Sequence, residues 1–212
     1  MLQEKFPNGA EVLLIKALNN VAPQYLKIRY NNIRGGFQKP ERVFNAELYH
    51  KLRKIQENSF DYEEIIIHQE ITKQKLHFHL DIVKLPNNEA DFPCIGHYRP
   101  RKISPDIVFH GGQNNTDNQL LVAEIKMEGT SWLNIIKDFQ KLMFYKLSRL
   151  QFQNAVFIYT GTKEDLEDIF FSLHLSFLEC LQKNKIIIVL PFSKNKQNYE
   201  WKAYQINLEN HI

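Results

Sequence analysis

One stretch of nine residues, 119–127, constrains the fold of this chain most strongly. It reads Gln-Leu-Leu-Val-Ala-Glu-Ile-Lys-Met, and an extended chain would place apolar side chains of its first half on both faces. Strands of this kind lie inside a sheet that is covered on both faces. A chain of 212 residues is long enough to supply both covering layers and to bury a core without a metal or disulfide staple.

Apolar periodicity elsewhere predicts helices and further strands around that stretch. A proline suits the first helical turn, so one helix is expected to begin at Pro40. Helical spacing of apolar residues predicts further helices at 10–21, 132–150 and 164–182. Short apolar or alternating runs predict strands at 63–73, 76–85, 103–109, 155–159, 186–190 and 199–208, the last at a sheet edge. The order predicts an α/β (α+β) fold with a central mixed β-sheet flanked by helices.

Composition and charge restrict the class of protein. Aromatic residues make up 12% of the chain, which argues against intrinsic disorder. The net charge of +3 permits a polyanionic partner without requiring one. No apolar run approaches the roughly 20 residues of a membrane span, so we expect no membrane partner. Cys94 and Cys180 lack metal-binding spacing, and free thiols with no signal peptide predict a cytoplasmic protein.

Charged residues interrupt two of the apolar strands. Glu124 and Lys126 are two residues apart, so a strand projects them to the same face. Burying such charges costs several kcal/mol per ion unless they are paired or bind something. Asp106 follows Pro105 in the run 103–109, and on a neighbouring strand, about 4.8 Å away, it would lie beside Glu124. Two carboxylates that close repel each other, and a divalent cation between them removes the conflict.

The order and spacing of these residues resemble those of a known family. Pro105-Asp106, followed some eighteen positions later by Glu124-Ile125-Lys126, resembles the PD-(D/E)XK nuclease superfamily. The resemblance implies a restriction-endonuclease-like core and hydrolysis of phosphodiester bonds, with DNA as the expected substrate. It also implies that Asp106, Glu124 and the carbonyl of Ile125 hold Mg²⁺ or Mn²⁺. Lys126 would then orient the attacking water and offset charge in the transition state.

Other residues extend the resemblance over residues 40–160. Glu47 resembles the acidic residue that many members place on the helix before the sheet, where it would help bind a second metal. Its place beside an apolar stripe also suits a solvated flank, and Glu70 on the first strand is a rival for the same role. The helix that carries Asp138 and Lys141 looks like the one that follows the site in small stand-alone members.

Basic residues gather near the expected site. Arg99, Arg101 and Lys102 precede Asp106, and together with Lys141 they predict a surface that follows a nucleic-acid backbone. Positive charge of this kind is needed around an acidic metal centre because a polyanion would otherwise be repelled. Solvated loops are the alternative interpretation. Residues 1–39 are expected to be a helical, basic extension of a nuclease-like domain at 40–212, the whole forming one compact unit.

A second group of metal-binding residue types occurs earlier in the chain. His77, His79 and Asp81 share one face of the expected strand 76–85, so a zinc or manganese site is conceivable. The favoured interpretation of this alternation is a solvent-exposed face of a β-hairpin.

Two other classes of function remain open beside the nuclease. The same fold could serve as a catalytically inactive subunit that binds nucleic acid or protein. The charged strand residues could also form a buried salt-bridge network that serves only the fold. If the chain cuts both strands of a duplex, a homodimer is the expected assembly, because two sites would then address two strands.

Overall fold

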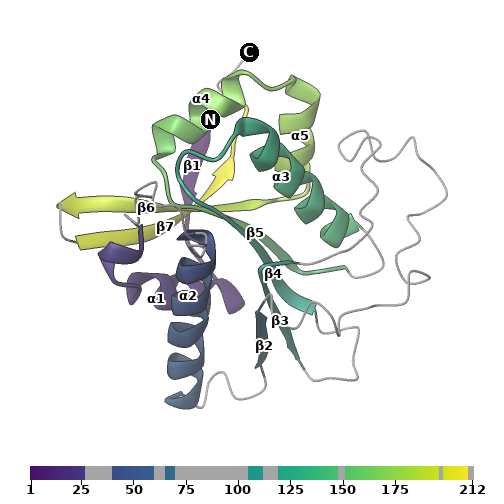
Figure 1. Cartoon of the computed structure of the whole chain (residues 1–212). Helices are drawn as coiled ribbons and strands as arrows, with labels where there is room; N and C mark the ends of the chain where they lie inside the picture. Colours follow the sequence, from purple (N-terminus) through teal and green to yellow (C-terminus); the bar gives the residue numbers. More distant parts are fainter. Residues whose placement is uncertain are drawn as a thin grey trace, which may run out of the picture.

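The computed structural model describes residues 1–26, 40–59, 65–69, 105–111, 119–147, 151–195 and 198–209 (Figure 1). Several features singled out from the sequence lie outside these residues: the expected strand 76–85, Glu70, His77, His79, Asp81, Cys94, Arg99, Arg101 and Lys102.

The described strands form one mixed sheet. Its order is β1-β7-β6-β5-β4-β3-β2. Pairing is parallel from β4 through β5 to β6 and antiparallel between all other neighbours. The strands are β1 Leu2–Lys5, β2 Ile65–Gln69, β3 Ile107–Gly111, β4 Gln119–Lys126, β5 Asn154–Tyr159, β6 Ile187–Asn195 and β7 Asn198–Ile206. The predicted interior position of 119–127 is confirmed, since β4 lies between β3 and β5.

The described α-helices cover both faces of this sheet, as Figure 1 shows. One face carries α1 (Ala10–Asn19) and α2 (Pro40–Glu57), with the short 3-10 helix η1 (Pro23–Leu26) beside α2. The other face carries α3 (Trp132–Leu147), α4 (Lys163–Phe171) and α5 (Leu175–Lys183). The mixed α/β architecture predicted from the sequence is thereby confirmed.

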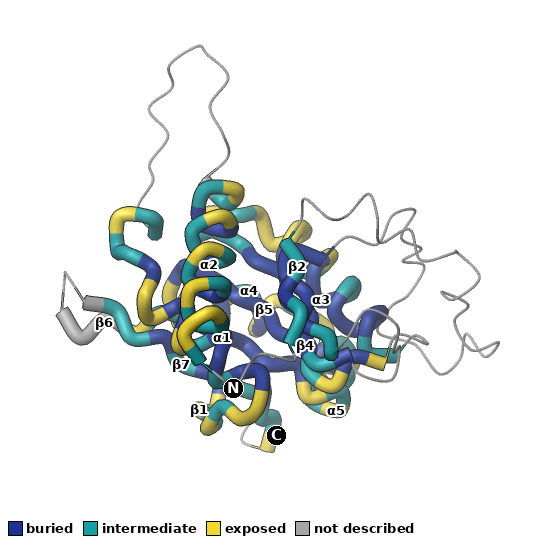
Figure 2. The backbone as a smooth tube through the Cα atoms, turned by 90° about the horizontal axis from the view of Figure 1, so that it is seen from below, coloured by how far each residue is buried: buried dark blue, intermediate teal, exposed yellow. Residues whose placement is uncertain are grey.

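Each face of the sheet has its own apolar layer. The stripe Phe44, Leu48 and Leu52 packs α2 onto one face, as helical spacing predicts. Alternation along β4 then sorts its side chains: Ala123 lies in the α2 layer, whereas Val122 lies in the α3 layer. In Figure 2, seen from below, the buried strands lie behind α1 and α2, which turn their exposed residues outward. The alternation therefore directs residues 124 and 126 toward α3.

The helix expected at 164–182 is two helices. α4 ends at Phe171, and α5 begins at Leu175. The break has a local cause, because the His174 ring accepts a hydrogen bond from the Ser176 backbone N–H and so caps a new helix start. The cap expected at Thr162 is present: its side chain accepts from the Asp165 N–H.

The expected edge position of the last strand is also wrong. β1 pairs with β7 in antiparallel register, with Leu2 opposite Ile206, and so covers that edge. The sequence gives little sign of β1 because only one residue of Leu2–Lys5 is buried. The first residues of the chain, including α1, thus share the sheet and the apolar layer with the later ones.

Two expectations about compartment can be set against the structure. Cys180 takes part in a disulfide, so the prediction of a free thiol there is wrong and no longer supports a cytoplasmic location. Within the described ranges, no helix combines the length and the apolar character that a membrane crossing requires.

Candidate active site

Asp106 and Glu124 meet where β3 begins beside β4. The two strands are antiparallel neighbours, and Ile107 lies opposite Ala123. The Asp106 N–H donates to the Ala123 carbonyl at 3.1 Å, while Oδ2 of Asp106 accepts from the Ile125 N–H at 2.8 Å. Both carboxylates are buried, with Asp106 4% and Glu124 1% exposed. The predicted proximity of the two strands is confirmed.

The partners of Glu124 come from α3. The Lys141 Nζ lies 3.0 Å from Oε2 of Glu124, and the Tyr145 hydroxyl donates to Oε1 at 3.4 Å. Lys141 and Tyr145 are one helical turn apart, so they lie on the same face of α3. That face is the one packed on β4, which explains how a helix distant in sequence supplies both contacts.

Lys126 lies at the end of β4 among three oxygens. Its Nζ is 2.9 Å from Oδ2 of Asp138 and 3.3 Å from Oε2 of Glu41, and it donates to the Ile125 carbonyl at 3.0 Å. The other carboxylate oxygen of Asp138 lies 2.9 Å from the Lys141 Nζ. Asp138 therefore joins the two lysines. We call the whole group the charged cluster: Glu41, Asp106, Glu124, Lys126, Asp138 and Lys141.

Negative charge is in excess in this cluster. Four carboxylates against two ammonium groups leave a formal charge of −2 when all are ionised. Burial raises the pKa of Glu124 well above its usual value, Asp106 and Asp138 raise it further, and Lys141 lowers it by a smaller amount. Glu124 therefore holds its proton tightly, and a divalent cation would supply positive charge to the cluster.

The lysines of the cluster respond to the same excess. Burial by itself would lower the pKa of Lys126, but Asp138, Glu41 and Asp106 together raise it above its usual range. The pKa of Lys141 is likewise lowered by burial but raised more strongly by Glu124 and Asp138. Both side chains are therefore ammonium ions at neutral pH.

The donor types present fit a hard cation. Carboxylates and a backbone carbonyl are the ligands that Mg²⁺ and Mn²⁺ prefer, and Mg²⁺ is often held by one or two carboxylates with water completing its shell. Among the residues that the structure describes, no three histidine, cysteine, aspartate or glutamate side chains converge closely enough to hold a metal. In the charged cluster, ammonium groups stand between the acids instead.

The structure places two of the sequence-predicted site residues in contacts other than those expected. Glu47 is paired with Lys51 one turn further along α2, at 3.0 Å, and does not join the charged cluster. The acid that α2 does contribute is Glu41, six residues earlier. Lys141, expected to contact nucleic acid, is instead paired with Glu124 and Asp138.

The ion pairing of Asp138 could have been anticipated from the sequence. Asp138 is 3% exposed and lies in the buried stripe of α3 beside Phe139. A carboxylate in an apolar stripe is expensive unless it is paired, so its position marks Asp138 as a candidate for a paired or ligand-binding role. Glu41 gives no such signal, because an acid in the first turn of a helix is ordinary.

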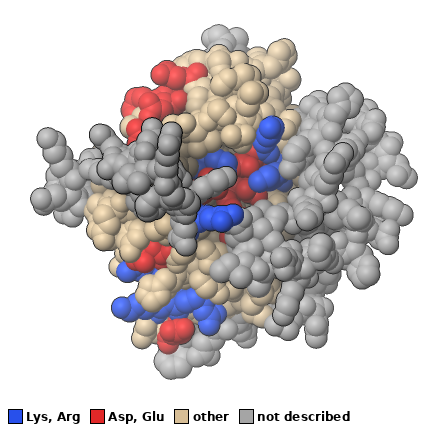
Figure 3. All heavy atoms as spheres, in the orientation of Figure 1, with Lys and Arg blue, Asp and Glu red and all other residues tan. Residues whose placement is uncertain are grey.

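The charged cluster reaches the surface through its basic side chains and Glu41. Lys126 is 13%, Lys141 29% and Glu41 31% exposed, whereas Asp106 and Glu124 lie beneath them. Figure 3 shows acidic atoms set between basic ones in a recess near the centre of this face. A ligand that entered there would meet the two lysines and Glu41 before it met the buried carboxylates of Asp106 and Glu124.

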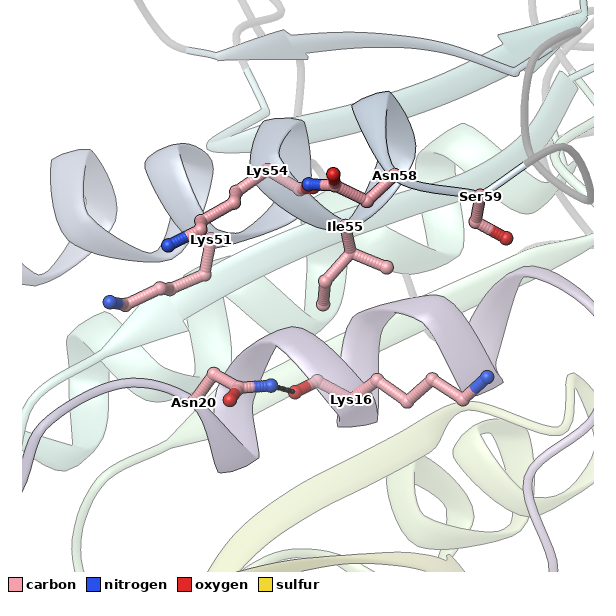
Figure 4. Close-up of a pocket in the computed structure, with 7 residues that line it drawn as sticks. All are labelled: Lys16, Asn20, Lys51, Lys54, Ile55, Asn58 and Ser59. Carbon is pink, nitrogen blue, oxygen red and sulfur yellow. Dashed lines mark hydrogen bonds between the residues drawn. The ribbon is translucent and has the colours of Figure 1, made fainter.

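A cavity of about 360 Å³ lies elsewhere, between α1 and α2. In Figure 4, the amines of Lys51 and Lys54 lie toward one end of it, while that of Lys16 lies toward the other, and Ile55 lies between the two helices. The lysines do not converge on a common point, and no member of the charged cluster lines the cavity. The candidate site is therefore the cluster rather than this cavity.

Comparison of the chain with known protein families, curated proteins and solved structures finds no match. Its function is therefore inferred from the geometry of the charged cluster.

Proposed function

We propose that this protein is a divalent-metal-dependent nuclease that hydrolyses phosphodiester bonds, with DNA as its substrate, on a restriction-endonuclease-like core. One observation carries the proposal. Asp106 and Glu124 come from adjacent strands to one buried place, beside Lys126, in a cluster with a formal charge of −2. A group with this excess of oxygen donors and this deficit of positive charge is suited to a hard cation.

The side chains would divide the work of hydrolysis. Asp106, Glu124 and the Ile125 carbonyl would hold Mg²⁺ or Mn²⁺, which polarises a phosphoryl oxygen and lowers the pKa of a bound water. Lys126 would donate hydrogen bonds to a non-bridging phosphate oxygen and offset the charge that develops there. Its ammonium group is available for this because Asp138 and Glu41 keep it protonated and hold it at the end of β4.

One observation favours a second candidate, a salt-bridge network without catalysis. Lys141 already neutralises Glu124 and Asp138, so the cluster has part of its charge balanced by the protein itself. A catalytically inactive subunit that only binds nucleic acid is compatible with the same contacts. The three classes differ in what the purified protein does to DNA.

Nicking of supercoiled plasmid separates them. We expect nicking with Mg²⁺ or Mn²⁺ and none with EDTA. Lys126→Met and Asp106→Asn should lower the rate by about 100-fold or more, because the first removes the group that would bind the phosphate and the second removes a charged ligand of the metal. Lys137→Met is the matched control, since Lys137 is an exposed lysine of α3 outside the cluster.

Each alternative outcome has a distinct meaning. DNA binding without nicking would indicate a catalytically inactive subunit that binds nucleic acid. Neither binding nor nicking, with strong destabilisation in both site variants, would assign the cluster to the fold alone.

A further inference from the structure

We infer that Lys141 is an internal competitor for the metal, whose ammonium group must leave Glu124 when a divalent cation binds. The inference rests on the proposed function, because it concerns Glu124, a ligand of the proposed metal. It goes further by naming Lys141 as the residue that blocks the metal from Glu124 and that moves away when the metal binds.

The positions of the two carboxylates support this role. Oε2 of Glu124 and Oδ1 of Asp138 both lie within 3.0 Å of the same Lys141 nitrogen. The ammonium group thus pairs with Glu124, the carboxylate that the proposed cation would share with Asp106, and Asp138 holds it there. A metal within bonding distance of Glu124 would repel this ammonium, since both carry positive charge at close range.

Of the two cluster lysines, Lys141 is the one able to leave. It is 29% exposed and ends a flexible four-carbon stem on α3, whereas Lys126 is 13% exposed and contacts three oxygens. A side chain that withdraws from Glu124 can stay hydrated in the recess that Figure 3 shows. There its charge would face an incoming phosphate, which is the role first expected for Lys141 from the sequence.

Reciprocity gives the inference a measurable consequence. If metal and ammonium exclude each other at Glu124, then removing the ammonium must strengthen metal binding. A purely structural Lys141 predicts the opposite, since its loss would disorder the acids that bind the metal. The two readings therefore differ in the sign of one affinity change.

The experiment is a Mn²⁺ titration of the folded full chain by calorimetry, in the absence of nucleic acid. We expect Lys141→Met to bind Mn²⁺ about tenfold more tightly than the wild type, within the usual range of coupling between sites. Lys137→Met, the exposed lysine four residues earlier, should leave the affinity unchanged. Equal or weaker binding by folded Lys141→Met would overturn the inference.

A second variant covers the case in which Lys141→Met does not fold. Lys141→Gln keeps a hydrogen-bond donor beside Glu124 but removes the charge, and it should also bind Mn²⁺ more tightly. Thermal unfolding gives a parallel result: in EDTA these variants should melt below the wild type, and Mn²⁺ should raise their melting temperature by more.

The outcome is separable from that of the proposed function. Tighter Mn²⁺ binding by Lys141→Met together with no plasmid nicking by the wild type would keep the competitor and discard the nuclease. Metal-dependent nicking with unchanged Mn²⁺ affinity would keep the nuclease and discard the competitor.

Discussion

The two long helices on opposite faces of the sheet, α2 and α3, each bury a polar side chain within an apolar stripe. The two buried side chains differ in whether they have a partner. On α2, Asn45 is 1% exposed, and neither its amide nitrogen nor its oxygen has a hydrogen-bond partner among the described residues. On α3, Asp138 is equally buried but forms ion pairs with two lysines. A neutral amide can stay unpaired at a cost of about 1–3 kcal/mol, whereas a charge cannot.

This difference marks the face of the sheet that holds the candidate site. The α2 layer places apolar side chains against the sheet, and its contribution to the charged cluster is an acid at the first turn, Glu41. The α3 layer brings Asp138 and Lys141 against Glu124, so three carboxylates are buried on this side. Burial of that much charge requires partners from several elements, and the same convergence could hold a cation.

The largest effect should come from removing the central acid of the cluster. Asp138→Ala leaves Lys126 and Lys141 without their shared partner, which should lower the free energy of unfolding by about 3–5 kcal/mol. Urea denaturation in EDTA measures it. Lys137→Ala, the exposed neighbour, should change stability by less than about 0.5 kcal/mol. A loss below about 1 kcal/mol for Asp138→Ala would show that the ion pairs are not holding the fold.

On the α2 face of the sheet, a core substitution should lower the free energy of unfolding through lost packing alone. Leu48→Ala removes a fully buried side chain from the α2 stripe and should cost about 3 kcal/mol. Because no charge is involved, the cost should be the same at pH 5 and pH 8, measured by the urea midpoint. A cost that varied with pH would mean that α2 packing and the charged cluster are linked, and the contrast between the faces would fail.

The pH dependence of stability should distinguish the cluster from the rest of the protein. The folded pKa of Glu124 is raised above its usual 4.5, because burial and then Asp106 and Asp138 disfavour its ionised form. Its proton therefore stabilises the folded state. That contribution is fully present below pH 4.5 and is lost as pH rises through the folded pKa.

Glu124→Gln tests this sign. The variant cannot lose the proton, so its stability relative to the wild type should increase as pH rises from about 4.5 toward neutrality. Chemical denaturation of both proteins across this range, in EDTA, gives the difference directly. A relative stability that stays flat or decreases would mean that Lys141 keeps Glu124 ionised throughout.

The smallest effect is expected at the unpaired amide. Asn45→Leu replaces it with an apolar group of similar size, which should raise the free energy of unfolding by about 1 kcal/mol. For a chain of this length, that corresponds to a melting temperature about 2–4 °C higher, measurable by calorimetry. Asn134→Leu, at an exposed position of α3, should have no such effect. A lower melting temperature for Asn45→Leu would show that a buried partner satisfies the amide in solution.

Local pattern predicted much of the fold, for identifiable reasons. β4 and the apolar stripe of α2 were predictable because strand and helix periods are properties of consecutive residues. The break between α4 and α5 was not, because it depends on a cap formed by His174. β1 was missed because its pairing with β7 joins the two ends of the chain.

The candidate site was predictable where it depends on neighbouring strands and not where it depends on helices. Asp106, Glu124 and Lys126 were identified because a charge within an apolar strand is costly wherever that strand lies. Glu41 and the pairing of Lys141 depend on how α2 and α3 are placed over the end of β4. No local pattern encodes that placement, so the sequence alone does not indicate that Glu41, rather than Glu47, lies beside Lys126.

The most direct test of a metal centre is a crystal of this protein soaked in Mn²⁺ and measured for anomalous scattering. The account predicts a peak between the carboxylates of Asp106 and Glu124, within bonding distance of the Ile125 carbonyl and with the Lys141 ammonium withdrawn. An ordered site without a peak at saturating Mn²⁺, with Lys141 still paired to Glu124, would contradict it.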